Sequence, residues 1–182
     1  MDVIEALYAE HEELRQFLSD AGELTFVAEI ERTYPKVLLI AAASLFETEV
    51  VAVLSDLFAA RSGNDELTLA FIRSKGFDRQ YHTYFAWKDG NANAFWSLFG
   101  ADFKTYAVAR LRGDETLTES ARHFIELGHL RNQLVHGNYL LFALEKTAEE
   151  VIALARSAFR FVEALPSVLR DYGGPEADVP DA

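Results

Sequence analysis

The sequence predicts an all-α protein, a bundle of four to five main helices with one irregular, aromatic-rich insertion. Apolar residues recur at helical spacing in several segments, whereas no useful stretch alternates apolar and polar residues as a strand does. Glycine, proline and capping residues fall where these helices would begin and end. The chain has 182 residues, 50% of them hydrophobic. This is enough for one domain with a single sizeable core.

The first third of the chain predicts two helices joined by an irregular piece. Residues 2–19 carry apolar side chains at helical spacing, and Asp2 and Glu5 are spaced like an N-terminal capping pair. Glycine and proline bracket residues 22–35, which are less regular. Residues 37–61 are almost uniformly apolar, so we expect a central helix that is covered on most sides. Glu10, His11 and Glu12 are typical of an exposed helix face.

The middle of the chain predicts a short helix from residue 64 to about residue 76, and another over residues 101–114. Residues 77–100 between them form the insertion. The residues that make it aromatic-rich favour core or interface packing over base stacking, because few basic residues lie among them. These are Tyr81, Tyr84, Phe85, Trp87, Phe95, Trp96 and Phe99.

Two further helices are predicted in the last third. One spans residues 118–136, with Thr118 at its start and Gly137 as a left-handed cap at its end. The last begins at a capping box of Thr147 and Glu150 and runs to Pro166. We therefore assign residues 1–170 to one helical domain with its insertion at 77–100, and residues 171–182 to a disordered acidic tail.

Composition limits the chemistry and the partners. The chain lacks cysteine, which excludes disulfides, thiolate zinc sites and cysteine nucleophiles. The formal net charge is 17 − 29 = −12, which argues against a general affinity for nucleic acid or anionic membranes. Residues 101–139 are balanced, with five basic and five acidic side chains. With no signal segment and no apolar run near the ~20 residues of a membrane span, we expect a cytoplasmic protein that does not contact membranes.

The neutral region contains the sequence RNQLVH at residues 131–136. Asn132 and His136 are four residues apart and so share a helix face, and the long side chain of Arg131 can reach toward the imidazole. His129, seven residues before His136, lies on the same stripe, which Glu126 extends. A phosphodiester can be cut without metal when a base takes a proton, a fixed cation neutralises charge on phosphorus and a hydrogen-bonding group orients them. Histidine, arginine and asparagine supply these three parts, and RNA supplies its own 2′-hydroxyl as the attacking group.

These residues resemble the Arg-x4-6-His motif of the HEPN superfamily, including the polar residue directly after the arginine. With the segment SLFETEV (residues 44–50) and the capped final helix, residues 30–170 are similar to the RiboL-PSP branch of that superfamily. The resemblance implies a helical homodimer in which two such motifs face each other across a cleft, often with metal-independent endoribonuclease activity. By position it implies catalytic roles for Arg131 and His136, support from Asn132, and a looser supporting role for Glu47.

Other readings of the same residues remain open. Arg131, Asn132 and His136 could be the solvated side of an amphipathic helix. Glu126 and His129 form one Glu-x-x-His element, but di-iron bundles use two, so we expect no metal and no cofactor. Glu47 could be a structural carboxylate paired with Arg131 or His136 from the neighbouring helix.

The leading hypothesis is a metal-independent endoribonuclease that cuts RNA by 2′-hydroxyl attack, as a toxin or phage-defence component. Its expected partners are RNA, a second copy of the chain, and an antitoxin or other protein. The alternative is a non-catalytic module of the same fold that binds a protein or a nucleotide.

Overall fold

The computed structural model describes residues 1–139 and 141–173, and within these ranges the protein is helical without any strand. The prediction of an all-α fold is confirmed. The tail prediction falls mainly on residues 174–182, which lie outside the described residues. The elements are α1 (Asp2–Asp20), α2 (Leu24–Arg61), α3 (Glu66–Ile72), a π-helical turn (Arg73–Phe77), α4 (Tyr81–Tyr84), α5 (Asn93–Ser97), α6 (Ala101–Arg112), α7 (Glu115–His136) and α8 (Ala148–Arg170).

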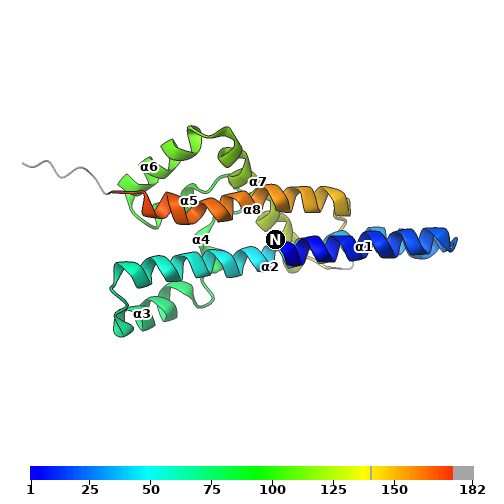
Figure 1. Ribbon diagram of the computed structural model, residues 1–182, viewed down its shortest axis with the longest axis horizontal. Coiled ribbons are helices and arrows are strands. Elements are labelled where there is room, and N and C mark those ends of the chain that lie inside the picture. The colour runs from blue at the N-terminus through cyan, green and yellow to red at the C-terminus, as the bar shows by residue number, and fades with distance from the viewer. Residues whose placement is uncertain (140, 174–182) are drawn as a thin grey trace, which may run out of the picture.

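Four long helices, α1, α2, α7 and α8, form the frame of the described part of the molecule. Helices α1 and α2 make an antiparallel hairpin, and α8 lies along α2 (Figure 1). Helix α7 packs against both α8 and α2, and Leu127 and Leu134 on its inner side are almost fully buried. The core between these helices includes the aromatic rings of Phe46, Phe124 and Phe161, each 1% exposed, and the Phe124 ring contacts the other two. This frame fixes the position of the RNQLVH segment.

Helix α2 begins 13 residues earlier than the sequence predicts, because residues 24–36 are helical rather than irregular. Pro35 lies inside the helix, where it removes one backbone donor. The cost is outweighed by packing, since Pro35 and Lys36 are both buried and the Tyr34 hydroxyl donates to the carbonyl of Leu7 on α1 at 3.1 Å. Helix α8 likewise continues past Pro166, because Val168 and Leu169 beyond it are buried.

Helix α2 is also long and apolar enough to cross a membrane by length and composition alone, contrary to our expectation for this sequence. A core helix passes the same test. In this structure the apolar side chains of α2 contact other helices of the protein, and Leu38, Leu39 and Val50 are 0% exposed.

Two predicted helix starts differ from the structure. Glu5 makes no cap for α1; instead it accepts two hydrogen bonds from Arg156 of α8, at 2.8 and 2.6 Å. Helix α7 is capped by Asp114, whose carboxylate accepts from the backbone N–H of Leu117 at 2.9 Å, one turn before the predicted cap Thr118. Asp114 takes this place because an aspartate is as good an N-cap as a threonine, and Thr118 instead donates to the carbonyl of Leu111.

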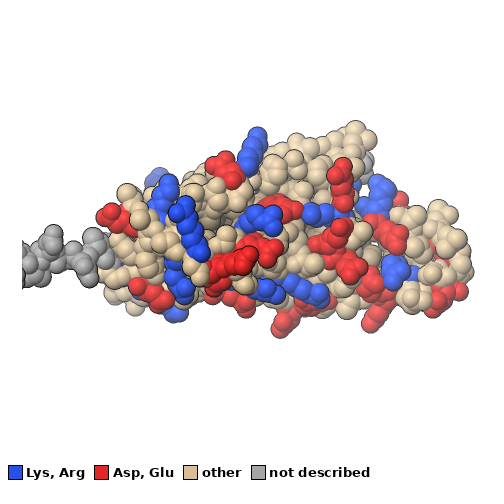
Figure 2. All heavy atoms as spheres, turned by 90° about the horizontal axis from the view of Figure 1, so that it is seen from above, with Lys and Arg blue, Asp and Glu red and all other residues tan. Residues whose placement is uncertain are grey.

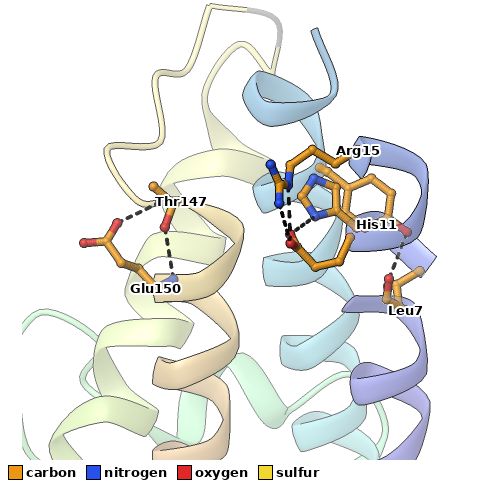
Figure 3. Close-up of polar contacts among 7 residues, drawn as sticks. Leu7, His11, Arg15, Thr147 and Glu150 are labelled. Carbon is orange, nitrogen blue, oxygen red and sulfur yellow. Dashed lines mark hydrogen bonds and ion pairs between the residues drawn. The ribbon is translucent and has the colours of Figure 1, made fainter. Parts of the chain in front are cut away.

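The capping box of the last helix is confirmed. Thr147 Oγ1 accepts from the backbone N–H of Glu150 at 3.1 Å, and the Glu150 carboxylate accepts from the backbone N–H of Thr147 at 2.8 Å (Figure 3). At the same end of the bundle His11 is only 2% exposed, so the prediction of an exposed face is wrong for this residue. Its ring stacks on Tyr34 at 4.5 Å, which explains the burial. His11 Nδ1 lies 3.2 Å from the Glu12 carboxylate without forming a well-directed hydrogen bond.

The insertion is part of the core, as predicted for its aromatic residues. Phe95 and Trp96 of α5 are 0% exposed, and Tyr84 and Phe85 are also buried. Their rings connect the insertion to the frame: Phe85 meets Phe124 of α7 at 5.0 Å, edge to face. Tyr81 and Trp87 are only partly buried, and they lie where the insertion faces a cavity.

Candidate functional site

A cavity of about 530 Å³ lies between α2, α7 and the insertion. Four of the residues singled out in the sequence line it: Arg131, Asn132 and His136 from α7, and Glu47 from α2. These side chains come from two helices that are distant in sequence. The fold therefore brings them to one space, where a ligand could contact all four.

The end of α7 presents the motif to solvent. His136 is the last residue of α7 and is exposed, whereas Arg131 and Asn132 are half-buried. Arg131 Nη1 donates to Asn132 Oδ1 at 3.1 Å, so Asn132 orients the guanidinium rather than the imidazole. The motif is thus reachable from solvent, as the reading as a site and the reading as the solvated side of an amphipathic helix both predict; its place on the wall of a cavity favours the site.

Gly137 ends α7 in a way the sequence did not predict. Its backbone is extended, with φ −87°, rather than left-handed. A Cβ atom there would lie 2.8 Å from the carbonyl oxygen of Gln133, so glycine is needed for close approach and not for a positive φ. The chain can therefore leave the helix directly after His136.

Glu47 is half-buried and forms no ion pair with Arg131 or His136 in the described part of the chain, contrary to the structural pairing considered above. The Tyr81 hydroxyl, from the insertion, interacts electrostatically with both Glu47 and Arg131. Burial raises the pKa of the Tyr81 hydroxyl well above its usual range, the Glu47 carboxylate raises this pKa further, and Arg131 opposes the rise. The carboxylate and the guanidinium thus both act on one hydroxyl, which remains protonated at neutral pH.

The insertion supplies the wall of the cavity that sequence reasoning missed. Arg79, Tyr81, His82 and Trp87 all line it, and the indole Nε1 of Trp87 donates to the carbonyl of His82 at 3.0 Å. Arg79 has a left-handed backbone, with φ 61°, which is uncommon for a residue with a side chain. This wall adds a cation, an imidazole and two aromatic rings to the motif on α7.

Trp87 rests directly on α7 at Gly128. A Cβ atom at residue 128 would lie 2.0 Å from Cζ3 of the indole, so only glycine allows the ring to sit there. Gly128 within a helix is the one local signal that could have pointed to this contact, because a helix-interior glycine is unfavourable without a packing reason.

Replacing Gly128 by alanine should displace Trp87 and open the cavity wall. Overpacking typically costs about 1–3 kcal/mol, offset by up to about 1 kcal/mol of improved helix propensity. We expect a net decrease in the free energy of unfolding, measured by urea denaturation. In a Trp96→Phe background, where Trp87 is the one remaining tryptophan, we expect its fluorescence emission to shift to the red. Gly113→Ala is the matched control, because its added Cβ makes only ordinary contacts, 3.6 Å at the nearest. Unchanged emission in Gly128→Ala would contradict the contact.

Two predicted supporting residues lie apart from the main cavity. His129 lines an adjoining groove together with Asn132 and His136, beyond Trp87. Glu126 forms an ion pair with Lys146 at 3.0 Å and does not line the cavity. Within residues 1–139 and 141–173, no group of three or more His, Asp or Glu side chains is placed to hold a metal ion.

On the face that Figure 2 presents, the surface charge does not form one extended field. Figure 2 shows Lys and Arg interspersed with Asp and Glu over the face it presents. In the cavity the balance differs from that of the whole chain, because Glu47 is the single carboxylate among the described residues that line it, against Arg79 and Arg131. The cavity is therefore locally suited to a partly anionic ligand.

Comparison with models of known protein families matches residues 5–171 to RiboL-PSP-HEPN. The chain belongs to the RiboL-PSP-HEPN family. The match confirms the predicted resemblance and is wider than the predicted residues 30–170, because it also takes in most of α1. No curated protein and no solved structure matches this RiboL-PSP-HEPN chain.

Proposed function

We propose that this RiboL-PSP-HEPN protein is an endoribonuclease that cuts RNA by attack of the 2′-hydroxyl on the neighbouring phosphate. The observation that carries the proposal is that Arg131, Asn132 and His136 line one solvent-accessible cavity. A base, a cation and a hydrogen-bonding group are thus available to one phosphate. Burial of the motif under apolar side chains would instead have favoured a binding module.

The proposed reaction is a transesterification. His136 accepts the proton of the 2′-hydroxyl, the 2′ oxygen bonds to phosphorus, and the bond from phosphorus to the 5′ oxygen breaks. An imidazolium returns a proton to the departing 5′ oxygen. The products are a 2′,3′-cyclic phosphate and a 5′-hydroxyl. Arg131, fixed by Asn132, stabilises the negative charge that builds on the non-bridging oxygens.

The net charge of −12 does not oppose this proposal at the site itself. The cavity concentrates two guanidinium groups and two imidazoles around one carboxylate, and a groove with low-dielectric walls focuses their field on an entering phosphate. The charge does predict weak binding of RNA outside the cavity, and hence little affinity for duplexes that cannot enter it.

A homodimer is part of the proposal, because a second copy could supply the imidazole that protonates the 5′ oxygen. Exposed apolar side chains lie on the two helices that line the cavity: Val135 of α7, which also lines the cavity, is 49% exposed, and Val37 and Ile40 on α2 are 40% and 37% exposed. Ile40 shares a helix face with Ala43 and Glu47 of the cavity. Sedimentation at several protein concentrations tests for the dimer, and the Ile40→Lys variant should sediment as a monomer.

A toxin or phage-defence role, with an antitoxin as partner, extends the proposal to the cell. It places the protein in the cytoplasm, where RNA substrates are found. Expression of the native protein that is toxic to cells, together with loss of this toxicity in a variant lacking His136, would support this role.

The decisive experiment is incubation of the purified protein with single-stranded and structured RNAs in EDTA, followed by analysis of product ends. We expect cleavage without added metal and 2′,3′-cyclic phosphate ends, because the scheme uses side chains of the protein alone. Tight binding of RNA or nucleotide without cleavage would instead identify the protein as a non-catalytic binding module.

A further inference from the structure

The cavity is larger than a phosphate requires. Its volume of about 530 Å³ falls within the roughly 300–1,000 Å³ typical of small-molecule sites. Phe46, Phe124 and Leu127 form an apolar floor behind the polar motif, which serves no purpose for a phosphate. The space beyond the motif is therefore suited to the less polar part of a nucleotide.

The insertion provides rings against which a base could stack. Trp87 is half-buried, so part of its indole faces the cavity, and its orientation is fixed by Gly128 on one side and by the carbonyl of His82 on the other. The ring of Tyr81 lies 5.7 Å from it. Stacking on aromatic side chains is how proteins hold unpaired bases, and a ring that is already fixed loses little entropy on binding.

Glu47 determines which base fits beside these rings. It is half-buried, forms no ion pair within residues 1–139 and 141–173, and is the one carboxylate among the described residues that line the cavity. An ionised carboxylate only accepts hydrogen bonds. Guanine presents two adjacent donors, the ring N1–H and the exocyclic N2 amino group, and these match the two carboxylate oxygens. Adenine and cytosine place an acceptor nitrogen beside their amino group, and uracil flanks its single donor with two carbonyls.

Building on the proposed function, we propose that the cavity binds one unpaired guanine base, stacked on Trp87 with its Watson–Crick edge on Glu47. Its 3′ phosphate then lies at Arg131 and His136. The common effect of Glu47 and Arg131 on the Tyr81 hydroxyl puts both charges near a single side chain, so one nucleotide can span them. Cleavage therefore falls after unpaired guanosine, and duplex RNA is excluded because a paired guanine cannot enter.

Binding tests this inference without requiring catalysis. The probes are short single-stranded RNAs that differ from one another only at one central nucleotide, which is guanosine, inosine, adenosine, cytidine or uridine. This nucleotide carries 2′-deoxyribose, so the probe cannot be cut after it. Because hydrogen bonds to charged groups are the stronger ones, we expect the guanosine oligomer to bind about tenfold or more tightly than the other standard bases. Inosine, which lacks only the N2 amino group, should lie between.

Two matched Glu→Gln substitutions test whether Glu47 is the residue that selects guanosine. In Glu47→Gln the preference for guanosine should fall to about twofold or less, because the amide replaces one acceptor oxygen by a donor. Glu49→Gln, on the same helix but outside the cavity, should keep the full preference. Equal binding of all bases by the native protein, or an unchanged preference in Glu47→Gln, would overturn the inference.

Parallel cleavage of the all-ribose oligomers in EDTA separates this inference from the proposed function. Cleavage after every base alike would overturn guanine recognition and leave the nuclease proposal standing. Guanosine-selective binding without cleavage would support guanine recognition and overturn the nuclease proposal. Cleavage after guanosine that Glu47→Gln redirects to other bases would support both.

Discussion

Replacing His136 by alanine is expected to lower RNA cleavage by about 10²–10⁴-fold, the usual contribution of a positioned acid–base group. His136 is the exposed last residue of α7, so its loss removes no core contact and should leave helicity and thermal stability unchanged. Initial rates in EDTA at fixed RNA concentration measure the effect. His123→Ala is the matched control: it removes another imidazole from α7, one that contacts Ser157 at 2.7 Å away from the cavity.

Arg131 extends the same test to charge stabilisation. Arg131→Lys keeps the positive charge but loses the planar guanidinium that Asn132 holds, so we expect a loss of about 10²–10³-fold in kcat. Arg122→Lys, on an exposed part of the same helix, should cleave like the native protein. Undiminished cleavage in both His136→Ala and Arg131→Lys would reject the assignment of the motif as catalytic.

The helix ends that the sequence predicted correctly depend on local features. The capping box of Thr147 and Glu150 depends on residues three apart, and the end of α7 at His136 depends on the next residue, so neighbouring positions suffice to find them. The early start of α2 was missed because Pro35 is unfavourable by itself, and it is packing against the preceding helix α1, where Tyr34 contacts Leu7, that compensates for it. Where the local preference of the residues is weak or unfavourable, tertiary contacts determine where a helix begins and ends.

The same division holds for the candidate site. The spacing of Arg131, Asn132 and His136 on one helix could be read directly, and Glu47 could be placed through a family resemblance. The wall formed by Arg79 and the neighbouring insertion residues could not, because no helical period relates the insertion to α7. The ring of Trp87 can rest on α7 because Gly128 has no side chain, and the absence of a side chain is a weak signal in a sequence.

The insertion can hold this wall in place only if it is anchored as firmly as the helices. Trp96 is its anchor: the side chain is 0% exposed and its ring meets Phe161 of α8 at 5.8 Å and Phe103 of α6 at 6.0 Å. Phe95 next to it is also 0% exposed and continues the contact to Phe85 at 4.8 Å. The insertion is therefore expected to unfold with the bundle and not before it.

Trp96→Ala should accordingly destabilise the whole protein by about 3–5 kcal/mol, the range for truncating a fully buried large aromatic side chain. For a domain of this size each kcal/mol lowers Tm by about 2–4 °C, so Tm should fall by roughly 6–20 °C. Thermal and urea denaturation followed by circular dichroism measure the loss. Leu98→Ala is the control, since this side chain in the same segment is 58% exposed and should cost little. A Trp96→Ala protein with native stability would show that the insertion is a separate, loosely attached unit, and the cavity wall built on it would then lack a rigid support.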